Sequence, residues 1–274
     1  MQRRRAAAAF LLLCGGGLGT AAVAATAIAA GINLCWPSLL AGAGACLWLL
    51  GAGLLCWLLA LTAVAAGARQ LWRTARAFGA VLRRYRMQRD PRIDRVAAGV
   101  GIAAPIARSA DGRVWAATYG VWRPRIAVSA GLCDRLSDDE LAAVLLHEEL
   151  HRRCRDPLRL LLAQSARSVL GLLPAAGRIL TAHIEASELA ADAYAMERSG
   201  RRQLAAALWR LRAGAILAGA APFGPHDDLF TRRVAQIERY PAPLPAGGPS
   251  WRDAAAVAGA TAVAVAWSLV CLRP

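Results

Sequence analysis

Three long stretches without charged residues frame a more polar middle of the chain. They lie at residues 6–32, 39–66 and 254–272. Each is long enough to cross the hydrocarbon core of a bilayer as a helix. Residues 33–38 contain the turn-forming pair Asn33 and Pro37, so the first two stretches predict a helical hairpin. A cleaved signal peptide is the alternative for the first stretch, because small residues near Ala29 could form a cleavage site.

The segment that follows the hairpin is strongly basic. Residues 69–95 contain nine Arg and two Asp. The rule that positive loops stay inside predicts that this segment, and Arg3–Arg5, lie in the cytoplasm. A second interpretation is a helix attracted to anionic membrane lipid. Direct nucleic-acid binding is not expected, since no recognised binding motif accompanies the charge.

Residues 96–132 have a different pattern, which predicts a small β-sheet. Short runs rich in apolar and β-branched residues are separated by Gly and Pro. They lie at residues 102–103, 114–118 and 125–129. An edge strand of such a sheet could bind an extended peptide through backbone hydrogen bonds, or the sheet could serve packing alone.

The remaining polar part predicts helices. Helical patterns cover residues 158–173, 179–198 and 202–219, with Pro174 and Gly177 breaking the first from the second. A Pro- and Gly-rich linker, residues 241–253, precedes the last uncharged stretch.

Residues 137–157 predict one further helix, with a signal at both ends. Ser137 and Glu140 form a capping-box pair, and Leu136 and Leu141 stand where a hydrophobic staple would lie. Asp156-Pro157 marks a plausible stop. This helix carries His147 and His151, which four-residue spacing places on one face, so both imidazoles can bind the same ion. Glu148 lies beside that face, where it can take a proton from water that a metal activates.

A catalytic zinc site needs three protein ligands, and the third is expected downstream. Glu188 is the candidate ligand, and Asp192, one turn later, is expected to bond the far nitrogen of a zinc-bound imidazole. Glu185 is a weaker rival. Because His151 and Glu188 must meet on one side of the membrane, residues 158–173 are expected to be buried, interfacial or re-entrant.

Composition adds little to this picture. The chain has 274 residues, a net charge of +15 and 57% hydrophobic residues, and all its basic side chains except His are Arg. The seven Cys show no spacing typical of a disulfide framework. Cys154, three residues after His151, is a candidate fourth ligand if the zinc site were structural and closed.

Four segments of the chain carry a resemblance to a known family. The segments are residues 123–132, 139–144, 147–151 and 188–192. They resemble membrane zinc metallopeptidases of the beta-lactam sensor-transducer (Bla/Mec receptor) family, and more distantly the HtpX and CAAX-prenyl-protease group. The resemblance implies a zincin-like (gluzincin) fold, one Zn²⁺ held by His147, His151 and Glu188, and Glu148 as general base.

Two features depart from those families. No extracytoplasmic penicillin-binding domain is expected after residue 272. The His-Pro…Arg-Ile segment of the HtpX group is matched only loosely, by Pro225-His226 to Arg233-Val234. His226 and Arg233 are candidates for contacting the substrate carbonyl or oxyanion, with surface positions as the alternative for each.

The sequence therefore predicts a mainly α, α+β membrane protein with a small sheet. Its expected organisation is a transmembrane hairpin at 1–68, a cytoplasmic metallopeptidase domain at 69–240, a linker at 241–253 and a transmembrane helix at 254–272. The expected function is a multi-pass, inner (plasma) membrane zinc endopeptidase that cleaves a cytoplasmic or membrane protein, such as a regulator or repressor in signalling. Protein quality control of the HtpX kind and a non-catalytic scaffold with structural zinc are the alternatives.

Overall fold

The computed structural model describes residues 87–169, 174–217, 227–241 and 252–259, and residues 65, 68, 69, 72, 73 and 76 before them. The predicted membrane stretch 6–32 lies outside these residues, 39–66 does so except for Ala65, and 254–272 is described only to residue 259. Within the described part, no helix combines the length and the low polarity that crossing a bilayer requires.

The described residues fall into two compact units. One unit holds residues 76, 87–160, 184–217 and 227–241, and the other holds residues 65, 68, 69, 72, 73, 161–169, 174–183 and 252–259. The sheet, the paired histidines and the predicted third ligand all belong to the first unit. In the second unit, the Arg178 guanidinium donates to the buried carboxylate of Asp253.

The first unit contains a four-stranded sheet in the order β1-β2-β4-β3. The strands are β1 (Met87–Gln88), β2 (Ile106–Ser109), β3 (Ala116–Tyr119) and β4 (Arg125–Ser129). The central pair β2 and β4 is parallel, while β1 and β3 pair antiparallel at either edge. The predicted strands at 114–118 and 125–129 are confirmed within two residues. The strand expected at 102–103 is wrong, because Ile102 is buried in the loop after a helix and the strand begins only at Ile106, after Pro105.

The described residues include the following helices in chain order, besides a helical segment at residues 252–259. They are α3 (Pro91–Gly99), α4 (Ala130–Cys133), α5 (Asp138–Cys154), α6 (Asp156–Val169), α7 (Pro174–Ser199), α8 (Arg201–Leu217) and α9 (Asp227–Arg239). The predictions for α5, α7 and α8 are confirmed. Gly177 was expected to separate two helices but lies inside α7. The sequence patterns did not predict α3 or α9.

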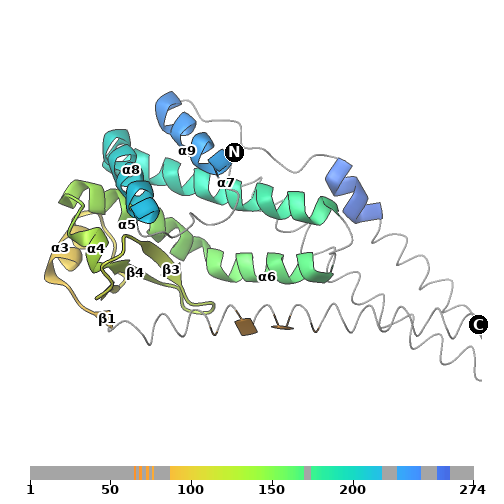
Figure 1. Cartoon of the computed structure of the whole chain (residues 1–274), viewed down its shortest axis with the longest axis horizontal. Coiled ribbons are helices and arrows are strands. Elements are labelled where there is room, and N and C mark those ends of the chain that lie inside the picture. Colours follow the sequence, from red (N-terminus) through yellow and green to blue (C-terminus); the bar gives the residue numbers. More distant parts are fainter. Residues whose placement is uncertain are drawn as a thin grey trace, which may run out of the picture. The chain divides into compact units, whose positions relative to one another are not determined.

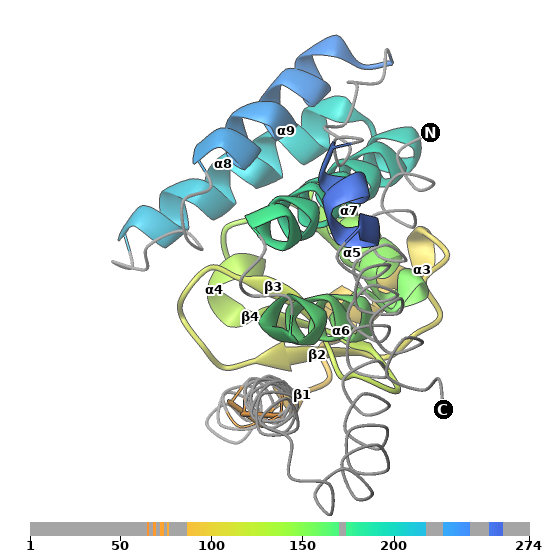
Figure 2. The same ribbon diagram turned by 90° about the vertical axis from the view of Figure 1, so that its right-hand side faces the viewer.

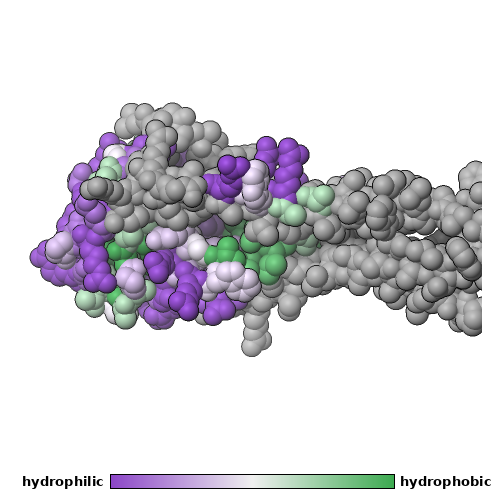
Figure 3. All heavy atoms as spheres, turned by 90° about the horizontal axis from the view of Figure 1, so that it is seen from below, coloured by the Kyte–Doolittle hydropathy of each residue, from purple (hydrophilic) through white to green (hydrophobic). Residues whose placement is uncertain are grey.

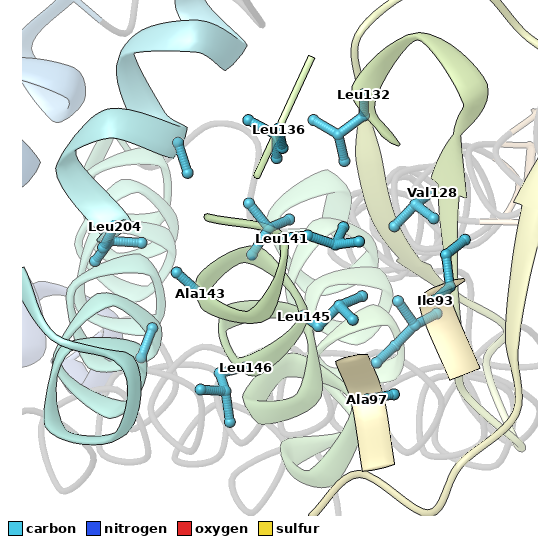
Figure 4. Packing of buried hydrophobic residues seen from close by; sticks show 14 of the residues in the cluster. Ile93, Ala97, Val128, Leu132, Leu136, Leu141, Ala143, Leu145, Leu146 and Leu204 are labelled. Atoms are coloured by element: carbon cyan, nitrogen blue, oxygen red, sulfur yellow. The ribbon is translucent and has the colours of Figure 1, made fainter. Parts of the chain in front are cut away.

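Helix α5 lies at the centre of the first unit, between the sheet and α8 (Figure 1). Figure 4 shows Leu141 and Leu145 on the side of Val128 and Ile93, and Ala143 on the side of Leu204. Almost every residue from 140 to 147 is buried, so α5 packs on all sides, as a helix in a domain interior must. The histidines at its C-terminal end are therefore held on a rigid element.

Helix α9 packs beside α8 (Figure 2), with the Arg212 guanidinium 4.1 Å from the centre of the Phe230 ring. It also contacts α7, since Gln236 Nε2 donates to Leu189 O over 2.7 Å in a buried position. Among the coloured residues in Figure 3, hydrophilic ones predominate, with apolar ones between them. Helix α9 is thus joined to the helix that carries the predicted third ligand.

Candidate metal centre

The start of α5 is fixed by the predicted capping box. Glu140 N donates to Ser137 Oγ over 3.3 Å, and Ser137 N donates to Glu140 Oε2 over 3.0 Å. At the other end, Arg155 adopts the left-handed conformation with φ 53°, and α6 begins at the next residue, Asp156. The predicted stop is confirmed within two residues, but Asp156-Pro157 opens the next helix and the turn itself is made by Arg155.

Three side chains from two helices meet at one point. His147 Nε2 lies 3.1 Å from His151 Nε2. Glu188 lies on α7. Its Oε2 is 3.5 Å from His147 Nε2, and its Oε1 is 3.5 Å from His151 Nε2. Taking one ligand atom from each residue, the three lie within 4.8 Å of one another, and they form the group that could hold a metal in the described part of the chain.

The spacing and chemistry of these atoms fit zinc. Zinc binds imidazole nitrogen and carboxylate oxygen at roughly 2.0–2.2 Å in a tetrahedron, so neighbouring ligand atoms lie about 3.3–3.6 Å apart. The separation of the two Nε2 atoms, 3.1 Å, and that of each Nε2 atom from a Glu188 oxygen, 3.5 Å, are close to that range. The two 3.5 Å separations belong to different oxygens of Glu188, Oε2 for His147 and Oε1 for His151. A His/His/Glu set also leaves the fourth position of the tetrahedron open, as catalytic sites do.

His147 is supported by a buried carboxylate that is itself paired with an arginine. Its Nδ1 lies 3.0 Å from Asp192 Oδ1, although the angle at the ring departs from that of a good hydrogen bond. Arg233, on α9, donates from Nε and Nη2 to the two oxygens of Asp192, each over 2.7 Å. Its Nη1 lies 3.1 Å from Glu188 Oε2. One guanidinium therefore contacts both acids that α7 brings to the site.

His151 is supported by a different carboxylate, which the sequence analysis did not assign to the site. Its Nδ1 lies 2.8 Å from Asp156 Oδ2. The same oxygen accepts a 2.6 Å hydrogen bond from Ser187 Oγ on α7. Both imidazoles therefore have a carboxylate at Nδ1, which leaves both Nε2 atoms facing Glu188.

The charges around the histidines reinforce one another. Burial alone would lower the pKa of His147, but Asp192 and Glu188 outweigh it and raise that pKa to about 9. Burial would raise the pKa of Glu188, yet Arg233 and the two histidines hold it well below its usual range. The pKa of Asp156 is also lowered, because the bonds from His151 and Ser187 exceed the effect of burial. The acids are thus ionised at neutral pH, and a metal that binds must displace a proton from His147.

Glu148 lies next to this cluster and is held by the sheet. Thr118, on the edge strand β3, has its Oγ1 2.8 Å from Glu148 Oε2 and 2.9 Å from Glu148 O. The hydroxyl carries one proton, so it donates to one of these oxygens at a time. The carboxylate that could act as a base is therefore anchored to the strand nearest the site.

The other sequence candidates have different outcomes. Glu185 pairs with Arg232 of α9 over 2.8 Å and is not part of the metal group. The group does not include Cys154. The surface alternative for Arg233 is wrong, because its side chain is only 18% exposed and is bonded to Asp192 and Glu188. His226 lies outside the described residues.

Three contacts were missed by the sequence analysis, namely those of Asp156, Ser187 and Thr118. Asp156 was interpreted only as a helix stop, although an acid five residues after the second histidine is a signal that could have been followed. Ser187 and Thr118 are ordinary residues in a helix and a strand, and only the packing of α5 against α7 and β3 shows their partners.

Comparison with known proteins supports one family. Curated proteins and solved structures give no match. A family model described as "BlaR1 peptidase M56" matches residues 40–232, well over half of the 274-residue chain, and includes α5, β3 and the acids of α7. This agrees with the resemblance carried by the segments around His147 and Glu188. The chain therefore belongs to the BlaR1 peptidase M56 family of metallopeptidases.

Proposed function

We propose that the chain is a membrane-anchored, zinc-dependent endopeptidase. In this proposal His147, His151 and Glu188 hold one Zn²⁺ per chain, and Glu148 is the general base. The observation that carries it is the convergence of both Nε2 atoms on the Glu188 carboxylate, with a second glutamate next to the first histidine. The peptidase family of the chain supports the same chemistry.

Each residue of the site has its own role in the proposed peptide hydrolysis. Zinc, when bound, polarises the scissile carbonyl and makes a nearby water more acidic. Glu148 accepts a proton from that water while the water oxygen attacks the carbonyl carbon. Glu148 then returns the proton to the amine nitrogen when the C–N bond breaks. Asp192 and Asp156 keep the Nδ1 atoms occupied, so that both Nε2 atoms remain available as ligands.

The place of β3 in the sheet supports a protein or peptide as the substrate. This strand pairs with β4 along one side only, and it lies at the edge of the sheet in the described residues. Thr118 links the same strand to Glu148. A peptide that pairs with β3 by backbone hydrogen bonds would therefore run beside the base.

The sequence and the family both support a membrane setting for the domain. We propose that the stretches 6–32, 39–66 and 254–272 are membrane helices and that residues 69–240 face the cytoplasm, because the basic segment 69–95 favours that side. A cytoplasmic regulator is the substrate that best fits the signalling role implied by the resemblance to the sensor-transducer family.

The test is a Glu148→Gln variant of the full chain, with Glu197→Gln as a matched control on an exposed position. Glu148→Gln should keep about one zinc per chain and lose cleavage of a quenched fluorescent peptide library, and Glu197→Gln should keep both. Proteomics of cells that carry each variant should show fragments that vanish only with Glu148→Gln. Cleavage retained in purified Glu148→Gln would contradict the proposal.

A further inference from the structure

We propose that Asp156 is a positioning residue that fixes two of the three metal ligands at once, the imidazole of His151 and the helix segment that carries Glu188. This inference rests on the proposed function, since it concerns how the same site is built. It assigns a role to a residue that the sequence patterns placed only at a helix boundary.

One carboxylate oxygen makes both contacts. Asp156 Oδ2 lies 2.8 Å from His151 Nδ1 and accepts the 2.6 Å hydrogen bond from Ser187 Oγ. The side chain of Asp156 is only 16% exposed, so water competes little for this oxygen. Both distances are short for hydrogen bonds, as expected where the acceptor is an ionised carboxylate.

The local fold explains why the aspartate reaches both partners. Arg155 turns the chain in the left-handed conformation directly after α5, so that α6 starts at Asp156, five residues after His151. Ser187 immediately precedes Glu188 on α7. The carboxylate therefore joins the end of α5, the start of α6 and the middle of α7 at one atom.

The two bonds have separate consequences for the metal site. The bond to His151 keeps the proton on Nδ1, so that Nε2 presents its lone pair toward His147 and Glu188. The bond to Ser187 limits sliding or rotation of α7 beside α5, which would move the Glu188 oxygens away from the imidazoles. Asp156 thus sets the relative position of ligands that come from different helices.

An acid at a helix start is often explained by the helix dipole alone. That explanation requires no contact with His151 or Ser187, and the only cation near the other oxygen, among the ion pairs of the described residues, is Arg159 at 3.7 Å. The short contacts of Oδ2 point instead into the site. The two explanations differ in what they predict for zinc affinity.

The experiment measures zinc affinity of the purified full chain in detergent by competition with a chromophoric chelator. Asp156→Ala should weaken zinc binding by about 10- to 100-fold, the usual effect of removing the partner of a metal-bound histidine. Asp156→Asn, which keeps an acceptor for His151, should recover part of that loss, and Ser187→Ala should weaken binding only a few-fold. In the double variant Asp156→Ala/Ser187→Ala the two effects should not add, because both act through one oxygen.

Matched controls are Asp134→Asn, an exposed aspartate, and Ser199→Ala, whose hydroxyl bonds Ala195 O on the same helix α7. Both should bind zinc as the unchanged chain does. The visible spectrum of the Co²⁺-substituted chain adds a second measurement. It should change in Asp156→Ala, where His151 loses its acceptor, change by less in Asp156→Asn, and stay unchanged in the controls.

Wild-type affinity and an unchanged cobalt spectrum in Asp156→Ala or, should that variant not fold, in Asp156→Asn would overturn the inference. That result would leave the proposed function intact. Failure of the unchanged chain to bind zinc would instead contradict the proposed function, so the two failures are distinguishable.

Discussion

The two imidazoles of the site are held in different ways. His147 faces Asp192, which is fully buried and paired at both oxygens with Arg233. His151 faces Asp156, whose Oδ2 also accepts a hydrogen bond from the neutral hydroxyl of Ser187. The first support depends on a buried ion pair that bridges α7 and α9, and the second on hydrogen bonds at a helix junction. Substitutions on the His147 side and on the His151 side should therefore differ in their effects on zinc affinity and stability.

The largest effect is expected from Asp192→Ala. The change removes the acid beside His147 and leaves Arg233 with Glu188 as its remaining carboxylate at the site. Arg233 should then compete with zinc for Glu188, and zinc affinity should fall by about 100-fold, at the upper end of the usual range. Chelator competition measures it, and a loss smaller than that in Asp156→Ala would reverse the order that the structure predicts for the two sides.

Arg233→Gln should separate charge from geometry on the His147 side. The variant leaves the buried carboxylate of Asp192 and the half-buried one of Glu188 without their cation, and breaking a buried pair typically costs about 3–5 kcal/mol. Zinc brings positive charge to the same acids, so thermal unfolding should show a larger loss of stability in the metal-free chain than in the zinc-loaded one. Equal losses in both forms would show that Arg233 does not balance the charge of the site.

Both imidazoles should make the stability of the metal-free chain depend on pH, because the pKa of His151 is also raised, by Asp156 against the effect of burial. The pKa of His147 is about 9, above its ordinary value of 6.5, because Asp192 and Glu188 outweigh the opposing effects of burial and Arg233. A raised pKa contributes stability that is fully present below about pH 6.5 and is lost as the pH rises through 9. Thermal unfolding at pH 6 and pH 9.5 should show this loss without zinc, while zinc affinity should rise over the same range. A metal-free chain that gains stability toward pH 9.5 would contradict the assignment.

The smallest effect is expected from Thr118→Val, which touches neither imidazole. It removes the hydroxyl that contacts Glu148 and keeps the shape of the side chain in β3. The value of kcat should fall by several-fold, because the base is less well oriented, while zinc affinity stays unchanged. A loss of zinc in this variant would mean that β3 supports the metal ligands and not only the base.

The same contrast explains what the sequence could predict. The capping box at Ser137, the spacing of His147 and His151, and the Glu188–Asp192 pair are local patterns on single helices, and the structure has α5 and α7 at those places. Asp156, Ser187 and Thr118 join elements that are far apart in the chain or separated by a turn. Their partners depend on how α5 packs against α7 and β3, which no single-helix period encodes.

The sheet shows a similar limit. Strand β4 contains the apolar run Ile126–Val128, which predicts a strand. Strand β2 has Ile106 as its one large apolar side chain, and the sequence analysis placed it four residues too early. Helix α9 carries Arg233 into the site, yet its amphipathic pattern did not reveal which acids it would meet. Tertiary packing, and not local propensity, decides both.

The central claim is that α5 and α7 supply two imidazoles and one carboxylate to a single zinc ion. X-ray absorption at the zinc edge of the purified full chain tests it most directly. The structure predicts a shell of nitrogen and oxygen at about 2.0–2.1 Å, with the outer-shell scattering of two imidazoles, which falls to one in His151→Ala. Sulfur at about 2.3 Å, as Cys154 would give in a closed structural site, or the scattering of no imidazole at all, would contradict the account.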